Sequence, residues 1–316
     1  MAIRISRTET RCGRPLAGVL AGLATAVALA MPAPAVMAAA CGDMVLHAHR
    51  GSPDEPENSL SAVRGTLDGA WDGVEIDMQQ LQTGEWVLNH DLTLGRTTSV
   101  ARRTARELPA SAWRELRLKD RNGRLTVERG AFLSDVVDET RKHPDKVLNA
   151  EIKLPFSGCD ASLDADRAIA AGLPGGNWFL TAIDRRHLAC ARQIDPHGYM
   201  GLIVLDASVI ARQKGVPETF AERIRPANLD AAWMKRLLQD VGAPVGIHID
   251  AQTLKANPRV LAQARELGIP VLTYGLSGDR DHAEALRAVA AAVQMRPSGA
   301  IIDGTATGFC DAVNRH

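Results

Sequence analysis

The sequence has 316 residues, 46% of them hydrophobic, and a formal net charge of zero at pH 7. These values provide enough apolar side chains for a packed core and exclude an intrinsically disordered chain. The sequence contains no run of Lys or Arg that would indicate a nucleic acid or an anionic membrane as a partner.

The first forty residues have the features of a secretory signal peptide. A basic start with Arg4 and Arg7 precedes an apolar run over residues 16–31, and small residues follow up to Ala40. The apolar run is short for a membrane span, and no basic residues stop it, so we expect cleavage near Ala40 rather than an anchor. The mature chain, residues 41–316, would then carry a formal charge of −3, have no transmembrane span and be periplasmic or secreted.

Four cysteines remain in the mature chain: Cys41, Cys159, Cys190 and Cys310. An even number in an exported protein permits two disulfides, and four cysteines allow three pairings. If the fold is a barrel, its first and last segments lie close together, which favours Cys41–Cys310 with Cys159–Cys190. Buried free thiols are the alternative. Cys41 could also be a lipidated first residue, although Ala38 stands where a lipoprotein signal usually has an apolar residue such as Leu.

Short apolar runs alternate with amphipathic stretches through the mature chain, as strands buried on both faces alternate with helices. The predicted strands are residues 44–49, 74–78, 147–152, 178–183, 200–205, 245–249, 270–274 and 300–303. The predicted helices are residues 59–67, 132–141, 185–193, 231–241, 259–267 and 282–293.

Eight strands in this order predict a (β/α)₈ TIM barrel within a single domain over residues 41–316. A doubly wound open sheet is the alternative, but no G-x-G-x-x-G follows the first strand. The connection after the second strand is far longer than an ordinary βα loop. We therefore expect a small insertion subdomain there, at about residues 91–130.

Polar residues follow the early strands, at the end where TIM barrels build their active sites. His49 and Arg50 end the first strand, Glu75 and Asp77 lie in the second, and His90 ends the next extended segment. Glu151 and Lys153 belong to the third predicted strand. Residues two apart in a strand share a face, so Glu75 and Asp77 should point together, as should Glu151 and Lys153.

Three converging carboxylates would repel one another unless a cation lay between them. All-oxygen ligands suit Ca²⁺ or Mg²⁺, whereas no H-x-x-x-H or C-x-x-C spacing supports zinc. Such a metal would neutralise a bound phosphate, Arg50 and Lys153 would contact its other oxygens, and two histidines would act as acid and base. Each residue alone has an ordinary structural explanation, but their joint placement at successive strand ends favours a catalytic site.

These motifs resemble the signature of the glycerophosphodiester phosphodiesterases, a family of phosphodiesterase barrels related to the phosphatidylinositol-specific phospholipases C. The resemblance rests on His49-Arg50-Gly51, Pro56-Glu57-Asn58-Ser59, residues 73–77, His90-Asp91, Leu94, Arg96-Thr97-Thr98 and residues 149–153. The insertion and residues 299–303 are also similar to features of the family.

The resemblance implies the following roles. One divalent metal ion would be held by Glu75, Asp77 and Glu151. Ca²⁺ is favoured over Mg²⁺ because an exported enzyme meets plentiful Ca²⁺. The catalytic acid–base pair would be His49 and His90, and the substrate-binding residues Arg50 and Lys153. Glu57 and Asn58 would support Arg50 and its loop.

The implied reaction is metal-dependent hydrolysis of a small-molecule glycerophosphodiester to glycerol 3-phosphate and an alcohol. One histidine would deprotonate the neighbouring glycerol hydroxyl, which attacks phosphorus, and the other would protonate the leaving alkoxide. Water would then open the cyclic phosphate with the two roles reversed.

The substrate half of the site departs from the family pattern. Thr181-Ala182 stands where the family often has Ser-Phe, and Thr273-Tyr274 stands where it often has Trp-Thr. Tyr274 could still form an apolar wall with a hydroxyl, so we include it among the substrate-binding residues. The alternatives are a lipid-directed phospholipase D or lyase on the same barrel and an exported phosphodiester-binding protein. The head group and the oligomeric state stay open.

Overall fold

The computed structural model describes residues 41–204 and 229–315, which belong to the compact unit Val36–His316. The predicted signal peptide and its cleavage site lie outside the described residues, as does the last residue of the predicted strand 200–205. Among the described residues, we find no helix with the length and apolar character needed to cross a membrane.

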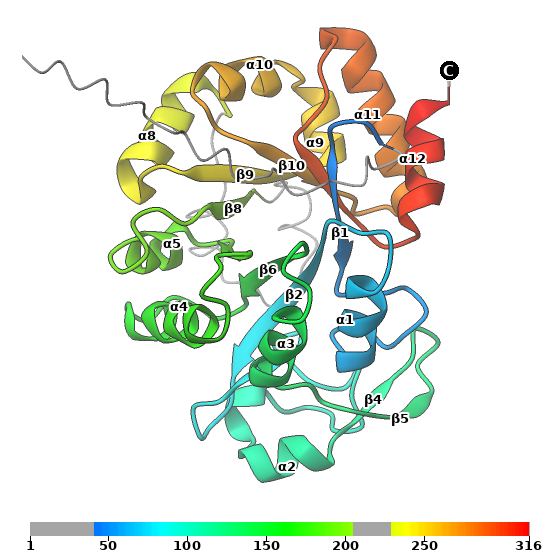
Figure 1. Cartoon of the computed structure of the whole chain (residues 1–316), viewed down its shortest axis with the longest axis vertical. Helices are drawn as coiled ribbons and strands as arrows, with labels where there is room; N and C mark the ends of the chain where they lie inside the picture. The colour runs from blue at the N-terminus through cyan, green and yellow to red at the C-terminus, as the bar shows by residue number, and fades with distance from the viewer. Residues whose placement is uncertain (1–40, 205–228, 316) are drawn as a thin grey trace, which may run out of the picture. The chain divides into compact units, whose positions relative to one another are not determined.

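Eight parallel strands close into a barrel, as the sequence predicts (Figure 1). The strands are β1 (Val45–His49), β2 (Gly73–Gln80), β6 (Val147–Ile152), β7 (Trp178–Ala182), β8 (Met200–Val204), β9 (Val245–Asp250), β10 (Val271–Tyr274) and β11 (Gly299–Ile302). Each barrel strand pairs with the next barrel strand along the chain. The barrel closes because β1 pairs with both β2 and β11. The described unit therefore has a closed sheet and its own hydrophobic core.

Helices surround the strands (Figure 1). They are α1 (Leu60–Leu67), α3 (Leu133–Thr140), α4 (Asp160–Gly172), α5 (Arg185–Ala191), α8 (Ala231–Val241), α9 (Ala251–Ala256), α10 (Arg259–Glu266), α11 (Asp279–Val293) and α12 (Ala306–Asn314). The sequence did not predict α4, α9 or α12. Most apolar positions of α4 are alanine and α9 has only six residues, so both give a weak helical periodicity, whereas α12 buries Phe309, Cys310 and Val313.

Alternation within each strand separates the packed wall of the barrel from its site. On β2, Val74, Ile76 and Met78 are fully buried against the helices, whereas the intervening Glu75 and Asp77 point to the barrel interior side. Deeper in the barrel, the rings of His47, Phe179, Tyr199 and His248 pack together. Burial lowers the pKa of His47 to about 4 and that of His248 to about 3, so both rings are neutral core residues at pH 7.

The long connection after β2 forms a small subdomain with its own core. After β3 (Trp86–Leu88), which pairs antiparallel with β2, come the 3₁₀ turn η1 (Ala105–Glu107), α2 (Ala110–Glu115), β4 (Arg117–Lys119) and β5 (Leu125–Arg129). The core gathers around the fully buried Trp113. In Figure 1 these elements lie together at the bottom, past the end of β2. We call this part, residues 91–130, the insertion.

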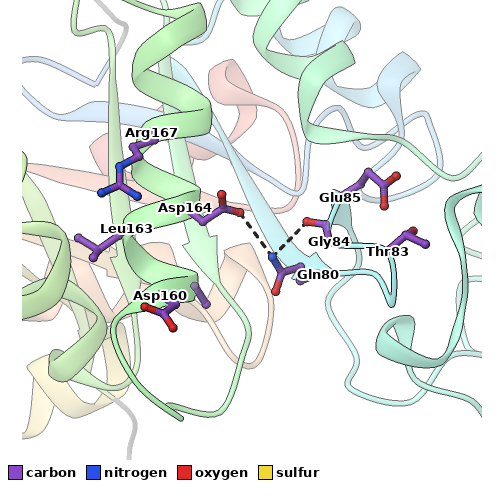
Figure 2. A pocket seen from close by; sticks show the side chains of 9 residues that line it. Gln80, Thr83, Gly84, Glu85, Asp160, Leu163, Asp164 and Arg167 are labelled. Atoms are coloured by element: carbon purple, nitrogen blue, oxygen red, sulfur yellow. Dashed lines mark hydrogen bonds between the residues drawn. The ribbon is translucent and has the colours of Figure 1, made fainter.

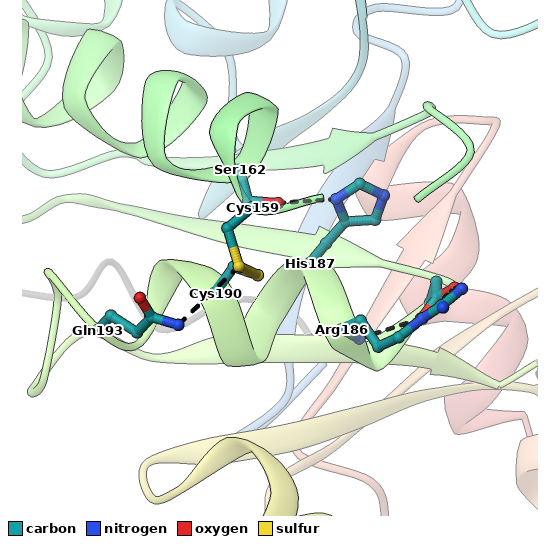
Figure 3. Close-up of a disulfide and its surroundings, with 7 residues drawn as sticks. Cys159, Ser162, Arg186, His187, Cys190 and Gln193 are labelled. Carbon is teal, nitrogen blue, oxygen red and sulfur yellow. Dashed lines mark hydrogen bonds and ion pairs between the residues drawn. A yellow bond between two sulfur atoms is a disulfide. The ribbon is translucent and has the colours of Figure 1, made fainter. Parts of the chain in front are cut away.

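Two disulfides fasten the barrel, with the expected pairing. Cys41–Cys310 joins the segment before β1 to α12, and it uses the sulfur that lipidation of Cys41 would require. Cys159–Cys190 joins the start of α4 to α5 (Figure 3). Beside it, buried His187 bonds the Ser162 hydroxyl (2.7 Å) and donates to the Leu154 carbonyl (2.9 Å). This contact fixes the loop that directly follows Lys153.

Candidate active site

Three buried carboxylates meet where β2 and β6 end. Glu75 and Asp77 lie on β2 and Glu151 on β6, and Asp77 is paired with Glu151 in the strand register. One oxygen atom from each lies within 4.8 Å of the others. The sequence predicts this convergence, because residues two apart on a strand share a face and paired residues of neighbouring parallel strands lie side by side.

The charges of this cluster do not cancel. Burial, then repulsion by Asp77 and Glu151, raises the pKa of Glu75 well above its usual value, and burial also raises the pKa of Glu151. The pKa of Asp77 is lowered, because nearby positive charges, Lys153 first among them, outweigh the effect of burial. The Lys153 ammonium lies 2.8 Å from Glu151 Oε1 and 3.4 Å from Asp77 Oδ1.

The cluster fits a divalent cation. Three carboxylate oxygens in one small volume are the ligand set of a hard ion such as Ca²⁺ or Mg²⁺. Asp77 Oδ1 is buried and accepts no hydrogen bond from any described residue, although the Lys153 ammonium lies 3.4 Å from it. A divalent cation would supply the close contact that this buried oxygen lacks, which agrees with the geometry of the three carboxylates.

A tight turn brings Arg50 to the same cluster. Arg50 has a left-handed backbone (φ 60°), and Gly51 follows at φ 89°, where a Cβ atom would lie 2.6 Å from that of Ala62. The Arg50 amide donates to Glu75 Oε2 (3.0 Å). Its guanidinium lies 3.0 Å from Glu57 Oε1 and 3.2 Å from Asp77 Oδ2. Glu57 and Asp77 therefore hold the Arg50 guanidinium. The left-handed backbone of Arg50 depends on these contacts.

The side-chain amide of Asn58 orients Asp77 through two hydrogen bonds. The Asn58 Nδ2 donates to Asp77 Oδ2 (2.8 Å), and its Oδ1 accepts from the Asp77 amide (3.0 Å). The backbone N–H of Asn58 in turn donates to the Arg50 carbonyl (2.9 Å). Asn58 also has a left-handed backbone, φ 58°, a conformation that Asn adopts more readily than most residues. The residue thus ties the Arg50 turn to the carboxylate cluster.

Each of the two predicted histidines is paired with an aspartate. His49 Nδ1 lies 2.7 Å from Asp303 Oδ1, and His90 Nδ1 lies 2.8 Å from Asp91 Oδ1. Both imidazoles are about a quarter exposed, with 28% and 29% of their side chains accessible. A carboxylate at Nδ1 fixes the ring and leaves Nε2 as the nitrogen available for proton transfer.

Both aspartates are held in their ionised form. Burial alone would raise the pKa of Asp303, but the hydrogen bond from His49 and nearby positive charges lower it. The pKa of Asp91 is also lowered, because hydrogen bonds from His90 and Arg96 outweigh burial. Neither aspartate was among the predicted site residues. Asp91 directly follows His90, and Asp303 directly follows the last strand, so their positions could have indicated them.

Arg96 is a further site residue that was not predicted. It donates to both oxygens of Glu57 (2.7 and 2.6 Å) and to both oxygens of Asp91 (2.7 and 3.1 Å). Glu57 contacts Arg50, and Asp91 contacts His90. The Arg96 guanidinium thus links Glu57, which holds Arg50, to Asp91, which holds His90. Arg96 follows His90 within the same stretch of sequence motifs, but its partner Glu57 lies 39 residues away.

Tyr274 ends β10, and its hydroxyl donates past β9 to the Val204 carbonyl at the end of β8 (2.7 Å). Its side chain is partly exposed there. The structure thus places Tyr274 at the same end of the barrel as the carboxylates. A contact between Tyr274 and a substrate stays a prediction.

The structure also contains a hollow of about 690 Å³ (Figure 2). It is formed by the turn between β2 and β3 and by α4, and Gln80 donates there to the Gly84 carbonyl (3.1 Å) and to Asp164 (3.4 Å). None of the three carboxylates or the two histidine–aspartate pairs lines it. We therefore assign the chemistry to the strand ends.

Known proteins resemble this chain in sequence and in fold. Residues 49–171 match the model of the glycerophosphoryl diester phosphodiesterase family. A glycerophosphodiester phosphodiesterase of Caldanaerobacter subterraneus is 42% identical over 53 residues, which are 16% of this chain and 22% of that protein. Human glycerophosphodiester phosphodiesterase 1 is 48% identical over 52 residues, 16% of each chain. These alignments thus cover less than a quarter of the relatives' lengths.

A phosphodiesterase of Oleispira antarctica, solved with the product sn-glycerol-3-phosphate, superposes with a TM-score of 0.61 at 19% identity, covering 86% of this chain and 97% of that one. This likeness shows a shared barrel fold. The matched segment 49–171 contains the Arg50 turn, all three carboxylates and His90. Through this segment, the chain resembles the glycerophosphoryl diester phosphodiesterase family.

Proposed function

We propose that this protein hydrolyses glycerophosphodiesters to glycerol 3-phosphate and an alcohol, with a divalent cation at Glu75, Asp77 and Glu151. One observation carries the proposal: the carboxylate cluster lies at the same end of the barrel as two histidine–aspartate pairs. The family match and the relative solved with glycerol 3-phosphate support this substrate class. We also propose that the chain is exported, on the basis of its first forty residues.

The cation would lie next to the phosphate-binding groups. When bound, it would neutralise charge on the phosphate and stabilise charge that develops in the transition state. Arg50 and Lys153, which already contact the same carboxylates, would then bind the remaining phosphate oxygens. We favour Ca²⁺ over Mg²⁺, since three protein carboxylates suit the larger coordination shell of Ca²⁺ and an exported enzyme meets plentiful Ca²⁺.

His49 and His90 would exchange protons with the substrate through their Nε2 atoms. One removes the proton of the glycerol hydroxyl next to the phosphate, and that oxygen forms a bond to phosphorus. The bond from phosphorus to the alcohol oxygen breaks, and the other histidine protonates this oxygen. Water then opens the cyclic phosphate with the two histidines in exchanged roles. Asp303 and Asp91 would stabilise whichever ring is protonated.

Cleavage of intact phospholipids by a phospholipase D or lyase reaction is the second candidate. The exposed side chain of Leu92 favours it, because this residue directly follows His90 and Asp91 and is 55% accessible. A binding protein without catalysis would not need two histidines that are each oriented by a carboxylate.

The first test is hydrolysis of glycerophosphocholine by the unit that begins at Val36. We expect release of glycerol 3-phosphate that EDTA stops and Ca²⁺ or Mg²⁺ restores, because the carboxylate cluster repels itself without a cation. Release of phosphocholine instead would show cleavage on the other side of the phosphate. No release by the folded protein with either metal would favour the lipid-directed candidate.

Glu75→Gln should weaken metal binding, measured by calorimetry, by at least about 100-fold, since it removes one charged ligand of three. The metal-free variant should be no less stable than the parent, because the neutral amide relieves repulsion with Asp77 and Glu151. Glu85→Gln, in the exposed turn after β2, is the matched control. Unchanged metal affinity in Glu75→Gln would refute the assigned metal site.

His49→Ala and His90→Ala should each lower kcat by about 10²–10⁴-fold, the usual contribution of a positioned acid or base. Metal affinity should change little, since neither ring contacts the carboxylate cluster through a hydrogen bond. His143→Ala, which precedes the amino-terminal end of β6 and is paired with Asp68, serves as control. If either site variant kept nearly full activity, its histidine would have no acid–base role.

Arg96→Gln should lower kcat by up to about 10²-fold, because it releases Asp91 and Glu57 and lets His90 and Arg50 move. Arg96→Lys should restore only part of the rate, since an ammonium cannot bridge both carboxylates with a planar fork. The ¹⁵N signals of the His90 ring would report the loss of its orientation. Arg129→Gln, whose guanidinium contacts Glu115 within the insertion, is the control. A wild-type kcat and unchanged His90 signals would contradict this role.

A further inference from the structure

The charges of the barrel unit are strongly segregated. Residues 96–129 contain ten Lys and Arg against four Asp and Glu, a formal charge of +6, whereas the rest of residues 41–316 has a formal charge of −9. The arginines are spread along the sequence, so no run marks them. The insertion brings them into one small folded part with its own core.

This basic part is attached to the active-site end of the barrel. Leu118 of β4 forms a bridge with Thr98, and the Lys119 amide donates to the Thr97 carbonyl (2.7 Å), directly after Arg96. The positive charge of Arg121, in the turn between β4 and β5, is one of those that help His49 to lower the pKa of Asp303. The charge at the tip of the β4–β5 hairpin thus acts on the His49–Asp303 pair.

Exposed apolar side chains accompany these charges. Val127 is 85% accessible and Leu125 50%, and they share one face of β5 because they are two residues apart. Arg121 and Arg124 are exposed in the adjoining turn. Leu92, also exposed, lies at the other end of the insertion. Half of the six large hydrophobic side chains that are exposed in the described part of the chain thus belong to the insertion.

This combination fits an anionic lipid surface. Basic residues are attracted to anionic head groups, and aliphatic side chains beside them can enter the boundary of the acyl chains. A single-stranded nucleic acid would need exposed aromatic rings for stacking, and the one aromatic residue of segment 96–129, Trp113, is fully buried. The negative body of the barrel would be repelled by the same surface, which would orient the molecule.

We propose that the β4–β5 hairpin, with Leu125, Val127, Arg121 and Arg124, docks this protein on an anionic phospholipid bilayer, with the active-site end of the barrel toward the lipid. Docking does not depend on the hydrolytic function proposed above, and it can be measured without any substrate. It would place the site close to phosphodiesters at the membrane surface.

The test is sedimentation of the unit that begins at Val36 with vesicles. The vesicles contain phosphatidylcholine alone or with about one third phosphatidylglycerol. We expect the anionic vesicles to bind at least about tenfold more tightly, and about 1 M NaCl to abolish most of this difference by screening. Arg121→Glu/Arg124→Glu and Val127→Asp should each reduce binding by about tenfold or more. Hydrolysis of soluble glycerophosphocholine should be unchanged in Val127→Asp.

Two control variants test the location of the surface. Ile194→Asp changes an exposed apolar residue after α5, and Arg265→Glu changes a cation in the last turn of α10. Both should bind anionic vesicles like the parent. The proposal would be overturned by equal loss in these controls, by equal binding to both kinds of vesicle, or by no binding at all. Self-association that Val127→Asp abolishes, without vesicle binding, would assign the hairpin to a second copy of the chain instead.

Discussion

Repulsion among three buried carboxylates is the constraint around which the site is arranged. Glu75, Asp77 and Glu151 are forced together by the pairing of β2 with β6 and cannot separate without breaking the barrel. Arg50 and Lys153 partly compensate the charge, Arg50 at Asp77 Oδ2 and Lys153 at Asp77 Oδ1 and Glu151 Oε1. The Asn58 side-chain amide donates to Asp77 Oδ2. The left-handed backbone at Arg50 and Asn58 is explained by this arrangement, since both residues must turn sharply to reach the cluster.

The elements that surround the cluster come from distant parts of the chain. The Arg50 turn follows the first strand, whereas Asp303 follows the last, and they meet because β1 pairs with β11. The insertion contributes Arg96, and the loop after Lys153 is fixed by His187 beside the Cys159–Cys190 disulfide. A closed barrel with tied loops can thus hold five or more charged side chains in a fixed geometry, which a flexible loop could not do.

The barrel could be predicted from the sequence because its strands are buried on both faces and therefore appear as short apolar runs. Each predicted strand agrees with the structure to within two residues where the structure describes it. The carboxylates and histidines could be predicted because they stand at strand ends with a spacing of two. Helix α4 was missed because Ala and Asp dominate it, leaving little contrast between its faces. Arg96 could not be assigned a role, since its contact with Glu57 depends on how the insertion folds back over the barrel.

The bridging position of Arg96 also has an evolutionary consequence. Glu57 and Asp91 belong to separate motifs, yet both accept hydrogen bonds from the same Arg96 guanidinium, two each. Substitution of one carboxylate leaves Arg96 free to change its contact with the other, so the two losses would not combine as independent effects. Selection would then act on Glu57, Asp91 and Arg96 as a single inherited unit, with strong epistasis even though Glu57 lies 39 residues from Arg96 in the sequence.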